Sequence, residues 1–147
     1  MAHEVSLTQV AEQPTAVVRF RTARDRLSID VPAACGEVWA FIKAANLAGA
    51  GRHIALYLDD CINVEAGAEI SQPFSGNGRV VCSRLPAGLV ATTAHIGPYA
   101  GLHATHSAVW RWCAANGRTR AGPSWEVYGH WTDDPSQLRT DVYYMVV

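Results

Sequence analysis

The chain has 147 residues, of which 49% are hydrophobic, and its 12 Lys and Arg residues nearly balance its 13 Asp and Glu residues. This length suits one globular domain with a substantial core, so we expect a single domain over residues 1–147. The arginines are scattered rather than gathered into a basic stripe, which argues against nucleic acid as a direct partner.

The N-terminus lacks a basic region followed by an apolar one, and no apolar run approaches membrane-spanning length. We therefore expect a cytoplasmic protein without a membrane partner. Four widely spaced cysteines in apolar surroundings indicate reduced, buried thiols rather than a disulfide framework: Cys35, Cys61, Cys82 and Cys113.

The first half of the chain contains short strand-like segments and one helical segment. Strands are expected over residues 5–10, 15–21, 53–58 and 62–70, with Asp59 and Asp60 in the turn that connects the last two. Asp30 is expected to cap a helix that has Pro32 in its first turn and ends near Asn46. Four apolar residues of that helix fall at i, i+3, i+4 and i+7 and form one apolar stripe: Val38, Phe41, Ile42 and Ala45.

The second half repeats this order of elements. Strands are expected over residues 78–85 and 89–96, then a helix from about Tyr99 to Ala115, then strands over 125–131 and 140–147. The halves align at a constant offset of 71 residues (109 − 38, 121 − 50 and 128 − 57). The aligned identities are Val38-Trp39 with Val109-Trp110, Ala50-Gly51 with Ala121-Gly122, and Tyr57 with Tyr128.

This repeat predicts an α+β fold. Two strand–helix–strand–strand units, the pseudo-repeats at about residues 1–75 and 76–147, would form one antiparallel sheet with two main helices. Two units related by a pseudo-two-fold axis would leave a central groove at their junction, and such clefts are common ligand sites.

The segment 125–131 carries an unusual carboxylate. Strand alternation places Glu126, Tyr128 and His130 on one face, and Trp125, Val127, Gly129 and Trp131 on the other. An ionised Glu in an apolar strand needs a cationic or hydrogen-bonding partner, or else it takes up a proton. A structural pairing of Glu126 with an Arg of its own chain is one interpretation. Because the repeat aligns Glu126 with Ala55, the carboxylate occurs in one half only, and we favour a functional role.

Several motifs of the second half together resemble the GyrI-like small-molecule-binding family, which also forms the effector-binding part of AraC- and MerR-type multidrug regulators. The motifs are Ala94-His95-Ile96-Gly97-Pro98-Tyr99, Leu102, Val109-Trp110-Arg111-Trp112, Gly122-Pro123-Ser124-Trp125-Glu126-Val127-Tyr128 and Thr140-Asp141-Val142. The resemblance is strong from about Leu89 to the C-terminus, and the first half matches mainly in its order of elements.

The resemblance implies a central groove that takes bulky, hydrophobic and often cationic aromatic compounds, with Glu126 in the pocket as the charge partner. No cofactor is expected. Because no helix-turn-helix module fits before residue 15, we expect a stand-alone binding domain. The ligand-binding candidates are Glu126, Tyr128, Tyr99, Trp110, Trp39 and Tyr57. For Trp39 and Trp110, packing between helix and sheet is an equal alternative.

One enzymatic alternative uses the same residues. Some free-standing GyrI-like proteins hydrolyse strained cyclopropane rings of DNA-alkylating natural products, and there Glu126 would be the general base and Tyr128 the hydrogen-bond donor. We expect a non-enzymatic binding protein first and a hydrolase second. A protein-interaction module ranks last because the composition shows no acidic cluster, and homodimer formation is left open.

The histidines give little sign of a site. His103 and His106 are spaced i, i+3 without a carboxylate or Cys ligand nearby, so we expect a solvated helix face and no metal site. His130 lies four residues from Glu126 along the expected strand, about 13 Å, so direct contact between the two is not expected.

Overall fold

The computed structural model describes residues 3–59, 62–76, 78–130 and 132–147 of the chain. Within these residues the chain forms eight strands, two α-helices and three short 3₁₀ helices. The strands are β1 (Ser6–Val10), β2 (Gln13–Arg21), β3 (His53–Tyr57), β4 (Asn63–Glu69), β5 (Val80–Leu85), β6 (Gly88–Ile96), β7 (Arg120–Tyr128) and β8 (Arg139–Val146). The helices are α1 (Leu27–Ala45), α2 (Leu102–Ala115), η1 (Arg24–Arg26), η2 (Tyr99–Gly101) and η3 (Pro135–Gln137).

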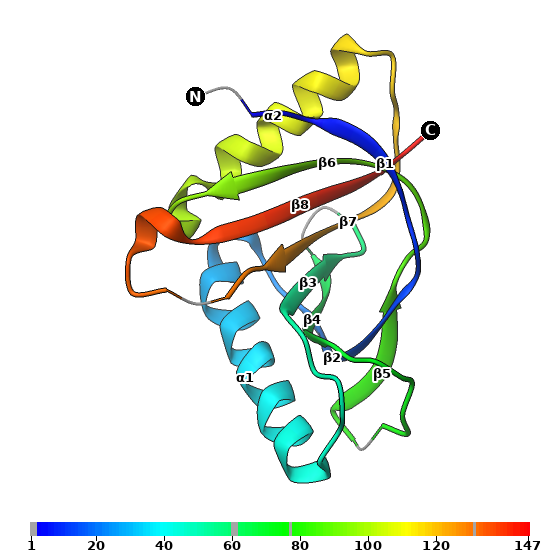
Figure 1. The fold of residues 1–147 in the computed structure, drawn as a ribbon, viewed down its shortest axis with the longest axis vertical. Helices are drawn as coiled ribbons and strands as arrows, with labels where there is room; N and C mark the ends of the chain where they lie inside the picture. Colours follow the sequence, from blue (N-terminus) through cyan, green and yellow to red (C-terminus); the bar gives the residue numbers. More distant parts are fainter. Residues whose placement is uncertain (1–2, 60–61, 77, 131) are drawn as a thin grey trace.

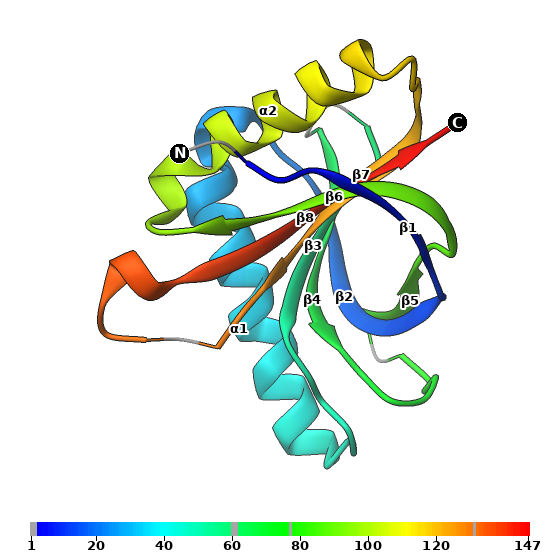
Figure 2. The same ribbon diagram turned by 45° about the horizontal axis from the view of Figure 1, so that its top comes forward.

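All eight strands form one antiparallel sheet in the order β1-β6-β8-β7-β3-β4-β2-β5. The element order β2-α1-β3-β4 recurs as β6-α2-β7-β8, and the strands of each unit follow the same order outward from the central β3–β7 pair. Figures 1 and 2 show the two halves, with α2 beside β6 and β8 and α1 beside β2, β3 and β4. The predicted α+β fold is confirmed.

The two edge strands are exchanged between the halves. β1 precedes β2 in the chain but pairs with β6, and β5 precedes β6 but pairs with β2. The expected boundary near residue 75 therefore separates β5 from the strand with which it pairs. Each half therefore supplies the outermost strand on the side of the other half, and this pairing links the two units.

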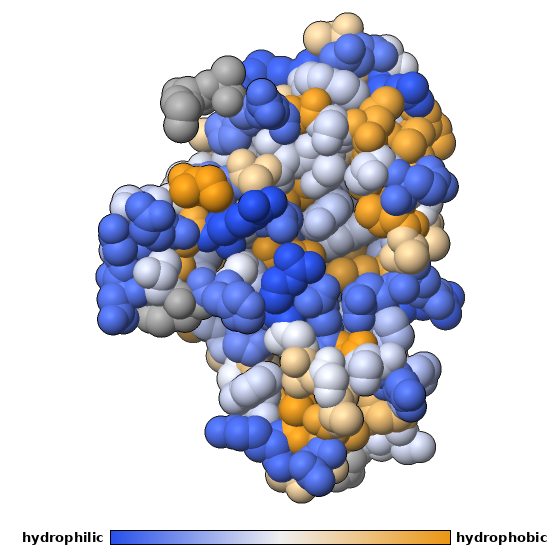
Figure 3. Space-filling view, in the orientation of Figure 1, coloured by the Kyte–Doolittle hydropathy of each residue, from blue (hydrophilic) through white to orange (hydrophobic). Residues whose placement is uncertain are grey.

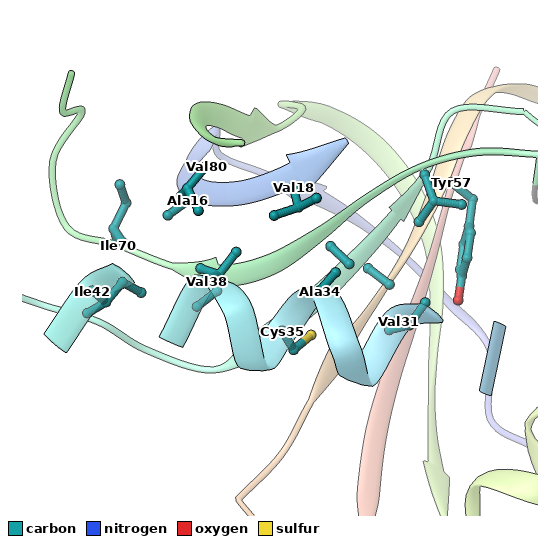
Figure 4. Packing of buried hydrophobic residues seen from close by; sticks show 14 residues of the cluster. Ala16, Val18, Val31, Ala34, Cys35, Val38, Ile42, Tyr57, Ile70 and Val80 are labelled. Atoms are coloured by element: carbon teal, nitrogen blue, oxygen red, sulfur yellow. The ribbon is translucent and has the colours of Figure 1, made fainter. Parts of the chain in front are cut away.

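Both helices cover the same face of the sheet. Glu126 on β7 pairs directly with Ala55 on β3 and with Val142 on β8, and directly paired residues point to the same face. Ala55 belongs to the apolar cluster under α1, whereas Val142 belongs to the cluster under α2. Figure 4 shows the first of these clusters, in which side chains of α1 such as Val38 and Ile42 face the sheet.

A third apolar cluster fills the opposite face, where Trp125 stacks on Tyr143 with ring centroids 5.4 Å apart. Trp125 and Val127 thus point away from Glu126 and Tyr128, as the strand alternation predicts. β7 ends at Tyr128, so the predicted continuation of the strand through Gly129 and His130 is wrong, and Trp131 lies outside the described residues.

The first helix begins earlier than predicted. η1 leads directly into α1, which starts at Leu27, so the predicted cap at Asp30 is wrong and Pro32 lies inside the helix. The Asp30 carboxylate instead accepts a hydrogen bond of 2.6 Å from Thr22 Oγ1. The predicted end is confirmed, because Asn46 caps α1 in a left-handed conformation with φ 54°.

Among the described residues, neither α1 nor α2 combines the length with the apolar composition that a membrane-spanning helix requires. On the face shown in Figure 3, hydrophobic residues form several separate patches among hydrophilic ones. Of the four cysteines, Cys35 and Cys113 are buried and Cys82 is half-buried, all three as free thiols, while Cys61 lies outside the described residues.

Substitution of Gly67 tests how closely β4 packs against β2. A Cβ at Gly67 would overlap the carbonyl oxygen of Ala16, so Gly67→Ala should lower the free energy of unfolding by about 1–3 kcal/mol. As a control, a Cβ at Gly36 on α1 meets nothing within 4 Å, and Gly36→Ala should raise that free energy by up to about 1 kcal/mol. Urea denaturation measures both changes, and an undiminished stability of Gly67→Ala would contradict this packing.

Candidate functional site

A cavity of about 730 Å³ lies between α1 and α2, above the central strands β3 and β7. This is the position of the predicted groove at the junction of the two halves. The two helices form its walls, mainly with apolar and aromatic side chains, and polar and aromatic side chains of the sheet form its floor. Among its lining residues are Leu27, Val31, Cys35 and Trp39 of α1, Leu102, His106 and Trp110 of α2, and Tyr57, Glu126, Tyr128 and Tyr144 of the sheet.

The Glu126 carboxylate lies on this floor and is buried, with 5% of the residue exposed. Its Oε1 accepts hydrogen bonds from the Tyr57 hydroxyl at 2.7 Å and the Tyr128 hydroxyl at 2.6 Å. Its Oε2 lies 2.6 Å from Nε2 of His106. Three donors from β3, β7 and α2 thus surround a carboxylate that would be costly to bury alone.

The surroundings of Glu126 favour its ionised form. Burial alone raises the pKa of the carboxyl, but the hydrogen bond and charge of His106 and the two phenol hydrogen bonds outweigh it. The net pKa of Glu126 is therefore lowered. Burial, followed by the negative charge of Glu126, raises the pKa of Tyr128 well above its ordinary value, so this phenol remains a neutral donor.

His106 is a site residue that the sequence interpretation missed. Its predicted place on a solvated helix face is wrong, because its ring lies between Glu126 and Tyr144, with Nδ1 2.6 Å from the Tyr144 hydroxyl. The periodicity of α2 contained the signal, since His106, Val109 and Cys113 fall at i, i+3 and i+7 on the buried stripe. The prediction holds for His103, which is exposed at the edge of the cavity.

The aromatic candidates line the same cavity. Tyr99 is 43% exposed, and its ring lies edge-on to the Tyr128 ring, with ring centroids 5.9 Å apart. Trp39 is 39% exposed and meets His53 edge-on, also at 5.9 Å. Trp110 is half-buried against Tyr144 at 6.3 Å, and the Arg120 guanidinium lies 4.9 Å from its ring centre. All six candidate residues therefore line one cavity, while their role in binding a ligand stays a prediction.

Glu126 is the only carboxylate among the described lining residues, whereas the cationic groups there are partly engaged elsewhere. Arg52 forms ion pairs with Glu69 at 3.2 Å and Asp141 at 3.5 Å. His130 lines the cavity but is not among the described hydrogen-bond partners of Glu126, in agreement with the expectation that they make no direct contact. Within the described residues, no group of three or more His, Cys, Asp or Glu side chains could hold a metal ion.

Removing one phenol hydroxyl should destabilise the ionised form of Glu126. Tyr57→Phe and Tyr128→Phe each delete one donor to Glu126, so each should raise the pKa of this carboxyl. Tyr143→Phe is the matched control, because Tyr143 packs against Trp125 on the opposite face. NMR titration of the side-chain carboxyl carbons measures this pKa. An unchanged pKa in both phenol variants would show that the hydroxyl groups do not stabilise the carboxylate.

A model of the GyrI-like small molecule binding domain family matches residues 3–147 of the chain. No curated protein matches it. Among solved structures, the C-terminal domain of EcmrR is similar with a TM-score of 0.80 and 20% identity, covering 100% of this chain and 99% of that one.

Two further solved structures have the same fold. SAV2435, solved bound to tetraphenylphosphonium, has a TM-score of 0.65 and 11% identity, covering 98% of this chain and 94% of that one. A hydrolase from Listeria innocua has a TM-score of 0.61 and 12% identity, covering 99% and 93%. Identities this low establish the shared fold alone. The family model, in contrast, spans nearly the entire chain, which therefore belongs to the GyrI-like small-molecule-binding domain family.

Proposed function

We propose that this domain binds hydrophobic, cationic aromatic small molecules in the cavity between α1 and α2, with Glu126 as the charge partner. The observation that carries the proposal is a buried carboxylate, hydrogen-bonded by two phenols and a histidine, on the floor of an aromatic-walled cavity. In this proposal residues 1–147 act as one binding unit, and its two pseudo-repeats supply the two walls. Its partner is the small molecule rather than nucleic acid.

The size and lining of the cavity fit such a ligand. A volume of about 730 Å³ falls in the range of about 300–1,000 Å³ that is typical of pockets for drug-sized molecules. A cation about 4 Å from a carboxylate gains roughly 4 kcal/mol at an effective dielectric constant of about 20, before desolvation is subtracted. Each ring face well placed beneath the cation adds about 0.5–2 kcal/mol. Flat aromatic walls tolerate varied shapes, so we expect selection by charge rather than by outline.

The two phenol hydrogen bonds of Glu126 leave its charge in place. The phenols of Tyr57 and Tyr128 are neutral donors, so the carboxylate retains its negative charge while its oxygens are held in place. A lipophilic cation can then be attracted without a direct hydrogen bond. The complex of SAV2435 with tetraphenylphosphonium supports this ligand class, because that cation also has no N–H or O–H to donate.

The hydrolase alternative is less well supported by the site. A general base must accept a proton from water, and a carboxyl with a lowered pKa that already accepts hydrogen bonds on both oxygens is a weak base. The phenols that would stabilise an oxyanion are already donating to Glu126. Fold similarity to the Listeria innocua hydrolase does not alter this comparison, so hydrolysis stays the second candidate.

Binding titrations test the proposal. Tetraphenylphosphonium and its neutral isostere tetraphenylmethane, solubilised in matched detergent, are titrated at constant pH while tryptophan fluorescence is followed. Wild type should bind the cation at least about tenfold more tightly, and Glu126→Gln should lose most of this difference, since about 1.4 kcal/mol corresponds to tenfold.

Glu65→Gln is the matched control, because Glu65 is also 5% exposed but binds Arg19 and Ser83 instead of lining the cavity. This control should leave the preference for the cation unchanged. Equal binding of cation and isostere by the wild type, or an undiminished preference in Glu126→Gln, would refute the role of Glu126.

A further inference from the structure

His106 places an ionisable group in direct contact with the charge partner. Both of its ring nitrogens are engaged at 2.6 Å, Nε2 with Glu126 and Nδ1 with Tyr144. If the ring is neutral, Nε2–H donates to the carboxylate and Nδ1 accepts from Tyr144, so the pair carries one negative charge. If the ring is protonated, both nitrogens donate, and the pair is neutral. One proton on His106 therefore sets the net charge of the cavity floor.

We propose that His106 determines which charge class of ligand the cavity accepts, and that a bound cation displaces the proton from His106. The inference rests on the proposed function, since it concerns the same site and the same ligands. A lipophilic cation and the imidazolium proton are two alternative positive charges for one buried carboxylate. Neutral aromatic compounds do not compete with the proton, so His106 would act on cations selectively.

The pseudo-repeat shows that this charged pair occurs on one side only. At the offset of 71 residues, His106 aligns with Cys35 (106 − 71) and Glu126 aligns with Ala55 (126 − 71). Burial raises the pKa of Cys35 to about 12, so this thiol is neutral at physiological pH. The two positions of the first half that align with this pair thus carry no charge, and the cationic centre of a ligand is expected near the α2 side of the cavity.

Other titratable groups face the cavity around His106, and they have to be separated from its effect. The phenols of Tyr57, Tyr128 and Tyr144 lie on the floor, and Cys35 faces it from α1. The remaining ionisable side chains of the lining are Arg24, Arg52, His53, His103, Tyr99 and His130. Burial lowers the pKa of His53, which favours its neutral form. Only His106 is a described hydrogen-bond partner of Glu126 among these histidines.

The proposal predicts proton release that accompanies cation binding. Where His106 is protonated in the free protein, the affinity for tetraphenylphosphonium should rise by up to about tenfold per pH unit, because one proton leaves for each cation bound. Calorimetry at a fixed pH near 6, in buffers with different ionisation enthalpies, counts this proton directly. The affinity for tetraphenylmethane should change little between pH 5 and 8, the range in which histidines titrate.

His106→Gln separates charge from structure. Gln can donate to the Glu126 carboxylate but cannot carry a positive charge, so the variant should still prefer the cation, with an affinity independent of pH and no proton release. His103→Gln is the matched histidine control on the same helix. His103 also lines the cavity, so its substitution can change the affinity itself. The His103→Gln variant should still release a proton on cation binding, as the wild type does.

The outcomes distinguish this inference from the proposed function. If the wild type prefers cations through Glu126 but releases no proton between pH 5 and 8, the role of His106 is refuted while the proposed function stands. Unchanged proton release in His106→Gln would likewise overturn it and assign the effect to another group. If cations are not preferred at all, the proposed function itself fails.

Discussion

The burial of one negative charge at the centre of the sheet is the constraint on which the site depends. A carboxylate with 5% of its residue exposed requires donors, and Glu126 obtains them from three elements that the fold brings together. Tyr57 comes from the first half of the chain, while Tyr128 and His106 come from the second. The charge therefore also links the two halves, since neither half alone supplies all three donors.

Pseudo-symmetry explains why the site lies where it does. Ala55 and Glu126 are aligned by the repeat and also directly paired across the β3–β7 junction, which places the pseudo-two-fold axis between them. Tyr57 and Tyr128, also aligned by the repeat, both reach the same carboxylate oxygen. The recurring order of elements gives a symmetric frame of phenols and tryptophans, and the buried carboxylate and its histidine lie at positions where the halves differ.

Much of this arrangement could be predicted from local patterns. Strand alternation separated Glu126 and Tyr128 from Trp125 and Val127, and the repeat placed Tyr57 in the position that matches Tyr128. These predictions succeed because they depend on the period of a single strand and on a constant offset. The edge strands could not be placed in this way. β1 pairs with β6 and β5 with β2, and such long-range pairing leaves no local pattern in either strand.

His106 shows a different limit of sequence analysis. Its spacing from His103 suggested an exposed pair, although its spacing from Val109 already placed it on the buried stripe of α2. Local sequence around His106 does not reveal that the Glu126 carboxylate, 20 residues further along the chain, will lie against it. The predicted start of α1 was wrong for a related reason. Asp30 and Pro32 fit a helix start locally, but η1 leads into α1 ahead of them, so the helix begins at Leu27.

A crystal structure of this domain with tetraphenylphosphonium bound would decide the role of Glu126, because it locates the cation relative to the carboxylate. We expect the phosphorus between α1 and α2 over the floor of the cavity, nearer to Glu126 than to Ala55, with phenyl rings against the aromatic walls. A cation bound outside this cavity, or one inside it but directed away from Glu126, would show that Glu126 is not the charge partner.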